Sequence, residues 1–267
     1  MDDLQKNGDL TPSDISRILA VTLLVFMVFF LVSGYLSNEA ALIGGELLLI
    51  VPALYYAKKR GASVRSTFRL YSVRPKVLFA VLLVFLPLYV LTDELDRIIQ
   101  MLAPMPEEWY ESMMEMVTFT NWREAIGVLF GGAVVAAAAE EMLFRGLLQR
   151  SLERFRDPAS AIVSASVLFA LVHFNPWTSI QILLLGVALG YAAWKSGSVI
   201  PSMILHGLNN LLSMLFVNAP PEMLSGYEGE MHVRLPVLLA AAAAFYPAWR
   251  LFVQTCREST PDREATD

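Results

Sequence analysis

Residues 131–146 read Gly-Gly-Ala-Val-Val-Ala-Ala-Ala-Ala-Glu-Glu-Met-Leu-Phe-Arg-Gly, so three charged side chains follow a run of small apolar residues. The stretch lies inside a longer apolar segment near 123–149, and a helix that crosses a bilayer needs about 20 residues. A charge at mid-bilayer costs about 2.5–3.5 kcal/mol on insertion scales, and such residues usually face a cavity and serve function. The stretch therefore predicts a transmembrane helix with a functional polar face.

The whole chain has the composition of a membrane protein. Apolar residues make up 56% of its 267 residues and charged residues 17%, whereas soluble proteins average about 45–50% and 25%. The mean hydropathy is +0.53. These numbers and the local pattern predict an all-α polytopic membrane protein, a single integral membrane domain over 1–267. Its eight candidate spans lie near 17–36, 39–57, 76–92, 123–149, 158–174, 177–194, 198–217 and 235–254.

Several classes of protein are excluded by residue usage. Cys256 is the single cysteine, which rules out an internal disulfide framework and a cysteine-based metal site. No basic cluster is interleaved with aromatic residues, so we expect no nucleic acid partner. Residues 1–16 are mostly polar and lack the features of a cleaved signal peptide. Thr11 and Pro12 instead predict a helix start, and the first apolar segment is expected to stay as an anchor.

Lysine and arginine are distributed asymmetrically between the loops. In an eight-span arrangement, most of these basic residues lie on one side of the membrane. The other side has only Arg97, Arg123 and Arg234, together with many acidic residues. Because positive loops stay in the cytoplasm, we expect both termini to be cytoplasmic. The basic residues on the predicted cytoplasmic side are Lys6, Arg17, Lys58, Lys59, Arg60, Arg65, Arg69, Arg74, Lys76, Arg150, Arg154, Arg156, Lys195, Arg250, Arg257 and Arg263.

The loop 93–122 is the longest on the predicted outer side. Its segments Asp93–Ala103 and Pro106–Val117 mix acidic side chains with large apolar ones in a helix-like pattern. This pattern predicts a pair of interfacial helices. A lid or substrate gate is the alternative.

The two adjacent glutamates of the charged stretch have different helical neighbours. Glu141 and Arg145 are four residues apart and share a face, so they can form an ion pair. Glu140 points about 100° away and lacks that partner. We therefore expect Glu141 and Arg145 to be structural and Glu140 to be the reactive carboxylate. The alternative is an ion pair at the cytoplasmic membrane edge, close to Arg150.

Two histidines and an asparagine also lie within apolar spans. His173 ends one span, while His206 and Asn210 share a helical face in another. A carboxylate with two imidazoles can activate water or bind zinc through three ligands, here Glu140, His173 and His206. An amide beside an imidazole can stabilise an oxyanion. Individually, each histidine could be an interfacial or hydrogen-bonded residue and Asn210 could join helices. His232 lies in an outer loop and is expected to be incidental.

Depth within the membrane constrains whether these groups meet. At about 1.5 Å per residue from the predicted cytoplasmic ends, His173 lies deeper than Glu140 and His206. The three converge only if the fifth span tilts or starts further into the cytoplasm. The short link at residues 174–176 could also stay within the protein.

Three segments together resemble the motifs of the CPBP family of CAAX protease and bacteriocin-processing proteins, also called Abi, which includes the type 2 CAAX prenyl proteases. The family pattern is Glu-Glu-x-x-x-Arg, Phe-x-x-x-His and His-x-x-x-Asn/Asp. It matches residues 140–145, 169–173 and 206–210, within a region of about 120–215. Other intramembrane protease motifs, His-Glu-x-x-His, Gly-x-Gly-Asp and Gly-x-Ser-Gly, are absent from the sequence.

The resemblance implies about eight helices around an intramembrane cavity and an endopeptidase that acts on a membrane-associated or lipidated protein or peptide. It implies that Glu140 and His173 activate the attacking water, that His206 and Asn210 form the oxyanion site, and that Glu141 and Arg145 hold the helices together. Family members have been described both as metalloproteases, with Zn²⁺, and as metal-independent glutamate proteases, so zinc stays open.

The expected location is a bacterial inner membrane, because the short spans and small loops resemble bacterial members. Two other functions stay open. One is an ion- or proton-coupled transporter that uses Glu140 and Glu141 as proton sites. The other is a non-catalytic membrane partner such as an immunity protein.

Overall fold

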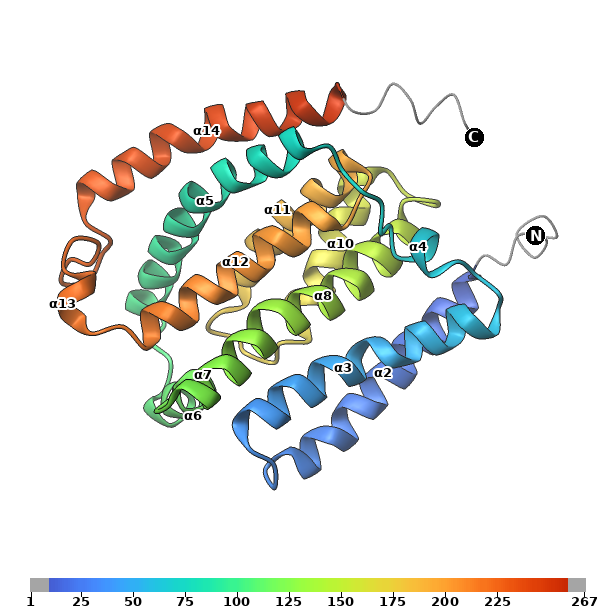
Figure 1. Cartoon of the computed structure of the whole chain (residues 1–267), viewed down its shortest axis with the longest axis horizontal. Helices are drawn as coiled ribbons and strands as arrows, with labels where there is room; N and C mark the ends of the chain where they lie inside the picture. Colours follow the sequence, from blue (N-terminus) through green and yellow to red (C-terminus); the bar gives the residue numbers. More distant parts are fainter. Residues whose placement is uncertain (1–9, 259–267) are drawn as a thin grey trace.

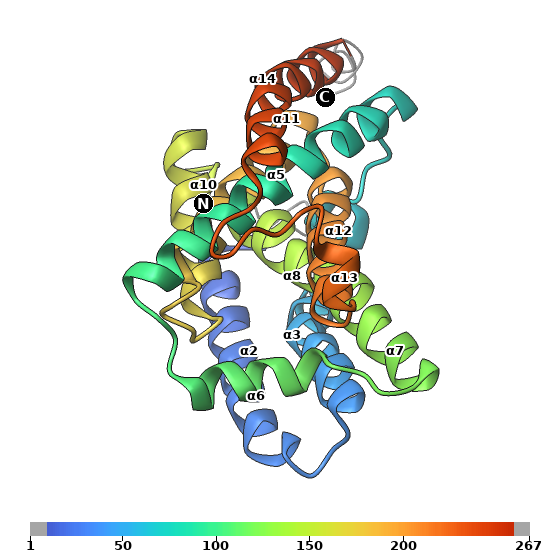
Figure 2. The ribbon, with the colours of Figure 1, turned by 90° about the vertical axis from the view of Figure 1, so that its left-hand side faces the viewer.

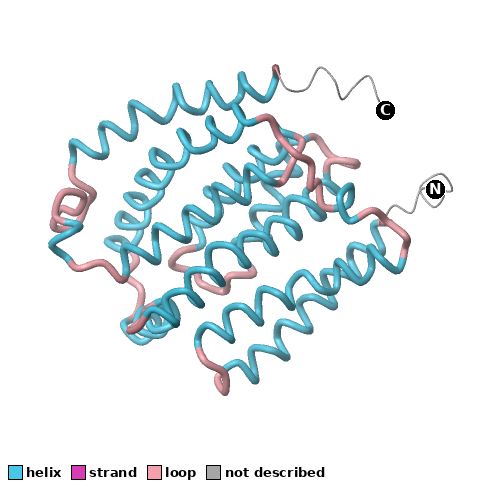
Figure 3. Tube along the Cα trace, viewed as in Figure 1, coloured by secondary structure: helices cyan, strands magenta, loops and turns pink. Residues whose placement is uncertain are grey.

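The computed structural model describes residues 10–258, which form a bundle of helices (Figures 1 and 3). Within these residues the only β pairing is an isolated bridge between Glu228 and Val233. The helices are α2 Pro12–Ser33, α3 Asn38–Lys59, α4 Val64–Thr67, α5 Pro75–Leu102, α6 Glu107–Val117, α7 Trp122–Leu129, α8 Ala136–Glu141, α9 Arg150–Leu152, α10 Pro158–Leu171, α11 Ser179–Ser196, α12 Ile200–Val217, α13 Pro221–Leu224 and α14 Leu235–Arg257, with π-helical segments η1 Phe130–Val135 and η2 Met142–Gln149.

Seven helices of the described chain are long and apolar enough to cross a membrane, which confirms a polytopic all-α membrane protein. Six of them are single helices, and the seventh is the 31-residue run Trp122–Leu152, made of α7, η1, α8, η2 and α9. The remaining predicted span, the fifth, near 158–174, corresponds to α10, which has 14 residues. At about 1.5 Å per residue α10 is roughly 21 Å long, shorter than the bilayer core of about 30 Å.

The packing order of the helices explains how distant segments meet. In Figure 1, α14 packs on α5, α5 on α12, α12 on α8, α8 on α3, and α3 on α2, while α10 pairs with α11. The outer faces stay apolar, as lipid contact requires: Leu24, Phe30 and Leu31 on α2 are 63%, 72% and 77% exposed. The central helix, Trp122–Leu152, therefore has protein on both sides and is the natural place for buried polar groups.

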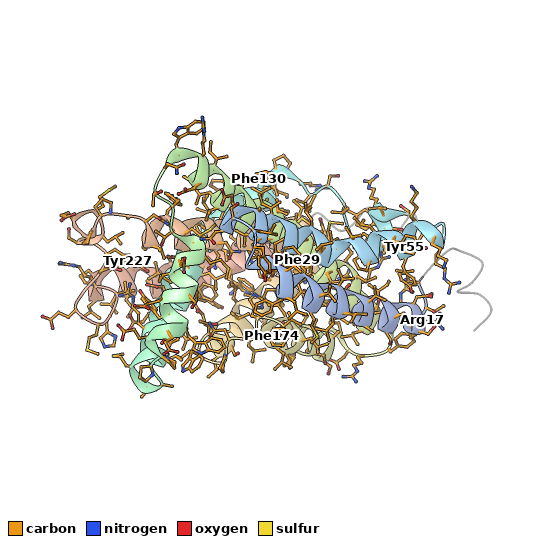
Figure 4. All side chains as sticks on the ribbon, turned by 90° about the horizontal axis from the view of Figure 1, so that it is seen from below. Arg17, Phe29, Tyr55, Phe130, Phe174 and Tyr227 are labelled. Carbon is orange, nitrogen blue, oxygen red and sulfur yellow. The ribbon has the colours of Figure 1, made fainter. Side chains whose placement is uncertain are left out.

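The bundle has two ends of different charge. At one, which we call the basic end, the start of α2 meets the end of α3, where Arg60 Nη2 lies 2.7 Å from Asp14 Oδ1. At the other, the acidic end, α6 carries Glu107, Glu108, Glu111 and Glu115. Figure 4 shows Arg17 and Tyr55 at the first end and Tyr227 at the opposite one. The start of α2 and the end of α14 lie at the same end (Figure 1).

The region after residue 93 differs from the predicted pair of interfacial helices. The first segment, Asp93–Ala103, is not separate, because α5 continues without a break to Leu102. Arg97 stabilises this extension by bonding to Asp93 and to Glu228. The second segment is α6, which crosses the acidic ends of α2 and α3 (Figure 2).

The predicted helix start at Thr11 is present. Thr11 is the N-cap of α2, Pro12 is its first residue, and Asp14 completes a capping box. The predicted features at Lys6 and Arg263, and both chain termini, lie outside the described residues.

Candidate active site

The first part of the site is a buried cluster that we call the anchor region: Glu141, Arg145 and the groups bonded to them. Arg145 Nη1 lies 2.8 Å from Glu141 Oε1, and the two side chains are 1% and 0% exposed. The guanidinium also donates to the Gly186 carbonyl on α11 and stands 4.1 Å from the ring centre of Phe169 on α10. This one pair therefore joins three helical elements, and the pairing that the four-residue spacing predicts is present.

His206 on α12 contacts the anchor region through one ring nitrogen and faces Glu140, the second part of the site, through the other. Its Nδ1 lies 3.0 Å from Glu141 Oε1, and the residue is 3% exposed. The carboxylate accepts a hydrogen bond from Nδ1–H and fixes the ring orientation, so Nε2 is directed to the other side. Gly207 permits this approach, because a Cβ there would stand 2.6 Å from the Ala133 carbonyl oxygen of η1.

His173 reaches the same place from a turn. The helix α10 ends at Leu171, and Phe174 has a positive φ of 50°. His173 Nδ1 lies 2.7 Å from the Phe169 carbonyl oxygen, so it donates its proton there. Its side chain is 30% exposed. The helix α10 begins at Pro158, close to the predicted start of this span, and His173 Nε2 still reaches within 3.9 Å of Glu140 Oε2. The groups therefore converge, which the depth estimate from the sequence left open.

The second part, which we call the reactive region, is centred on Glu140. Glu140 Oε2 lies 3.9 Å from His173 Nε2 and 3.9 Å from His206 Nε2. This oxygen is buried and has no hydrogen-bond partner among residues 10–258. Distances of 3.9 Å are too long for direct hydrogen bonds and suit a water molecule that bridges the groups. Glu140 thus differs from Glu141 in the way that its helical position predicts.

Asn210 lies one turn from His206 on α12, and its amide joins α12 to the central helix. Its Nδ2 donates to the Gly132 carbonyl of η1 at 2.9 Å. The π-helical segment frees carbonyls from the ordinary ladder, and such segments are frequent at functional sites. An amide group carries two N–H donors, so one remains for another acceptor.

The three candidate zinc ligands do not fit a zinc ion in this arrangement. Zinc holds nitrogen and oxygen ligands at about 2.0–2.2 Å, which places two tetrahedral ligands about 3.4 Å apart. The separations from Glu140 Oε2 are 3.9 Å. Within residues 10–258 no group of three His, Cys, Asp or Glu side chains is arranged to hold a metal ion. We therefore derive no step through a metal.

One carboxylate near the site was not predicted. Glu46 on α3 has a buried Oε2 without a partner among the described residues, and it interacts electrostatically with Glu140. The sequence contained a signal for it, because Glu46 is an ionisable residue inside the apolar span 39–57. In contrast, His232 lies away from these groups, with its Nδ1 at 2.6 Å from Glu94 Oε1.

A separate pocket of about 470 Å³ lies at the acidic end, between α3, α6 and α7. Glu39, Glu115 and Glu124 line it, and none of the site residues does. In the reactive region two imidazole nitrogens lie near one oxygen of Glu140, whereas no histidine lines the pocket. We therefore assign the candidate site there and not to the pocket.

Comparison with known proteins agrees with the three motifs. Residues 122–212 match the family model described as type II CAAX prenyl endopeptidase Rce1-like. The protein YyaK of Bacillus subtilis (strain 168), described as uncharacterized, is 30% identical over 92 residues, which cover 31% of this chain and 31% of that protein. No solved structure matches significantly.

The helices define an integral membrane protein, and its residues 122–212 match the Rce1-like family model. The matched residues 122–212 contain all three motifs, so the predicted resemblance to the CAAX protease family is confirmed. At the level of the family, the match supports an intramembrane protease.

Proposed function

We propose that the protein is an intramembrane endopeptidase in which Glu140 activates a water molecule for attack on a peptide bond. The observation that carries this proposal is the convergence of His173 Nε2 and His206 Nε2 on Glu140 Oε2, each at 3.9 Å. A general base must lie within hydrogen-bonding reach of the water that it activates, directly or through one water. The family match adds independent support for peptide bond hydrolysis.

The first step forms a bond between the water oxygen and the carbonyl carbon. Glu140 takes one proton from the water, and the carbonyl π electrons move to the carbonyl oxygen. His173 orients the water, because its Nδ1 bond to Phe169 leaves Nε2 facing Glu140. The second N–H of Asn210 would stabilise the oxyanion, together with His206 in its doubly protonated form, which donates from Nε2 while Nδ1 donates to Glu141. When the intermediate collapses, the C–N bond breaks and the departing amine gains a proton.

The substrate class that fits best is a membrane-associated or lipidated peptide. The reactive region is buried in a bundle whose outer faces are apolar, so a substrate held in the bilayer has the shortest approach. The description of the matching family, a prenyl endopeptidase, makes a prenylated peptide one candidate. We also place the basic end in the cytoplasm of a bacterium, since positive segments stay on that side.

A proton-coupled transporter is the second candidate, and the buried carboxyl pair of Glu46 and Glu140 is the observation that favours it. Such a protein would show a pH-driven flux that Glu140→Gln abolishes, without any cleaved product. A non-catalytic partner would keep its phenotype in that variant.

The test compares newly formed peptide termini in membranes of cells that express wild type or Glu140→Gln at matched levels. Glu230→Gln is the control, since Glu230 is exposed and makes the same change of charge. Termini that occur with wild type and Glu230→Gln, and not with Glu140→Gln, support the protease and identify its substrates. Equal termini in all three would contradict it.

A further inference from the structure

Glu46 lies on the face of α3 that packs against the central helix. A Cβ added to Gly131 would meet the side chains of Leu42 and Ile43, while Ile50 lies in one buried cluster with Ala139 of α8. At 100° per residue, positions 42, 43, 46 and 50 all fall within one third of the helix circumference, with Glu46 near its centre. The helix therefore directs Glu46 towards the helix that carries Glu140.

The carboxyl groups of Glu46 and Glu140 each have a buried oxygen, Oε2, without a hydrogen-bond partner among residues 10–258. They are close enough to interact electrostatically. Arg145 is a cation that interacts electrostatically with both Glu141 and Glu140, but one guanidinium cannot compensate three carboxylates. Glu46 and Glu140 cannot both be charged at low cost, because like charges repel strongly where water is excluded. The pair must therefore hold one proton between them.

We propose that Glu46 is a second catalytic residue, a general acid that shares one proton with Glu140 and delivers it to the departing amine. This inference rests on the proposed function. As Glu140 takes a proton from the attacking water, Glu46 gives its own proton to the amine nitrogen while the C–N bond breaks. The proton on Glu140 then passes to Glu46 and restores the pair.

Removing this proton source has a signature that a structural role does not produce. An amide needs a proton on its leaving nitrogen, whereas the alkoxide that leaves an ester needs it much less. We expect Glu46→Gln to lower amide cleavage about 100-fold or more, since general acid catalysis contributes roughly 10²–10⁴, and to leave ester cleavage close to wild type. Glu39→Gln, on the same helix, is the matched control.

The substrates for this comparison are a lipid-anchored peptide that spans a cleavage site from the terminus comparison and its depsipeptide analogue, with oxygen in place of the scissile nitrogen. If wild type cleaves neither, the proposed function fails. If wild type cleaves both and Glu46→Gln keeps full amide activity, Glu140 returns the proton alone and Glu46 is no general acid. An equal loss for amide and ester would also overturn the inference.

The shared proton itself is measurable without a substrate. Infrared spectra of the full-length protein in lipid bilayers report the carbonyl stretch of protonated carboxyl groups, which shifts in D₂O. We expect a band in wild type and Glu39→Gln that is lost in Glu46→Gln, because one carboxylate remains and can be charged. A band that persists unchanged in folded Glu46→Gln would overturn the shared proton.

Discussion

Glu140 and Glu141 are adjacent in the chain but stand in regions with opposite characters. In the anchor region, Glu141 Oε1 accepts from both Arg145 and His206 at 2.8 and 3.0 Å. In the reactive region, Glu140 Oε2 has two imidazole nitrogens at 3.9 Å and no hydrogen bond to the described chain. The charge of Glu141 is compensated by a hydrogen-bonded cation, whereas Glu140 Oε2 has no such bond in the described chain, and our proposal assigns water activation to it.

The comparison shows that two identical side chains in one buried site can have different roles, one structural and one chemical. A buried ion pair costs desolvation but fixes geometry, because removing one partner leaves an uncompensated charge. A buried carboxylate without a hydrogen-bonded partner is costly, which makes Glu140 a candidate for chemistry. His206 links the two regions, with Nδ1 on Glu141 and Nε2 towards Glu140. The anchor region therefore sets the position of the reactive one.

The largest expected effect on stability comes from breaking the anchor region. Arg145→Ala should lower the free energy of unfolding by about 3–5 kcal/mol, because it strands the buried charge of Glu141. Folded yield after detergent extraction, followed by thermal unfolding, measures this loss. Arg250→Ala is the control, because Arg250 is exposed and its polar contacts in the described structure are to Tyr246, to the hydroxyl at 3.3 Å and to the ring.

A double variant sharpens the same point. Glu141→Gln combined with Arg145→Met removes both charges, and we expect it to regain part of the folded yield that Arg145→Ala loses. A yield as low as that of Arg145→Ala would mean that shape, and not charge pairing, holds this region together.

In the reactive region we expect a substitution to lower activity and to leave stability unchanged. His173→Gln should lower kcat/KM about 100-fold, within the range for a group that assists proton transfer. Its thermal unfolding should match wild type, because the side chain is 30% exposed and bonds only to the Phe169 carbonyl within the described chain. Cleavage assays and unfolding on one preparation test this, and a large loss of stability would place His173 in the anchor region instead.

A smaller effect is expected where the two regions are brought together. Gly207→Ala would place a Cβ at 2.6 Å from the Ala133 carbonyl oxygen, so α12 must move away from η1. Overpacking of this kind costs about 1–3 kcal/mol and here should also displace His206. Gly34→Ala is the matched control, because nothing lies within 4 Å of its Cβ. Equal stability of both variants would show that the approach of α12 is not tight.

The smallest effect is expected from metal removal. Because the 3.9 Å separations at Glu140 are too wide for tetrahedral zinc, dialysis against a chelator should leave the cleavage rate unchanged. The assay is cleavage by purified protein before and after dialysis. A loss that added Zn²⁺ restores would mean that the histidines close around a metal.

Most of the helices could be predicted from hydropathy, but their ends could not. The third span was expected to stop near 92, yet α5 runs to Leu102, since the polar residues beyond the membrane keep helical pairing through Asp93 and Arg97. The fifth was expected to reach 174, yet α10 ends at Leu171. Pro176 disfavours helical conformation in the residue before it, so the sequence did contain a signal that this helix ends before Pro176.

The candidate site was predictable where charge stood out within an apolar span, as for Glu140, Glu141, Arg145 and the two histidines. Glu46 was missed although it also interrupts an apolar span. Its relation to Glu140 depends on the packing of α3 against α8, two segments almost a hundred residues apart, and no local pattern encodes that contact. The partner of Asn210, the Gly132 carbonyl, depends equally on a π-helical segment.

The most direct test of the central claim uses purified protein in lipid vesicles with a synthetic peptide that spans an identified cleavage site. Products are measured by mass spectrometry for wild type, Glu140→Gln and Glu230→Gln, and folding of each is checked by thermal unfolding. We predict that Glu140→Gln is folded like wild type and forms no product above background, while Glu230→Gln cleaves at the wild-type rate. Cleavage by folded Glu140→Gln at the wild-type rate would contradict the assignment of Glu140 as the reactive carboxylate.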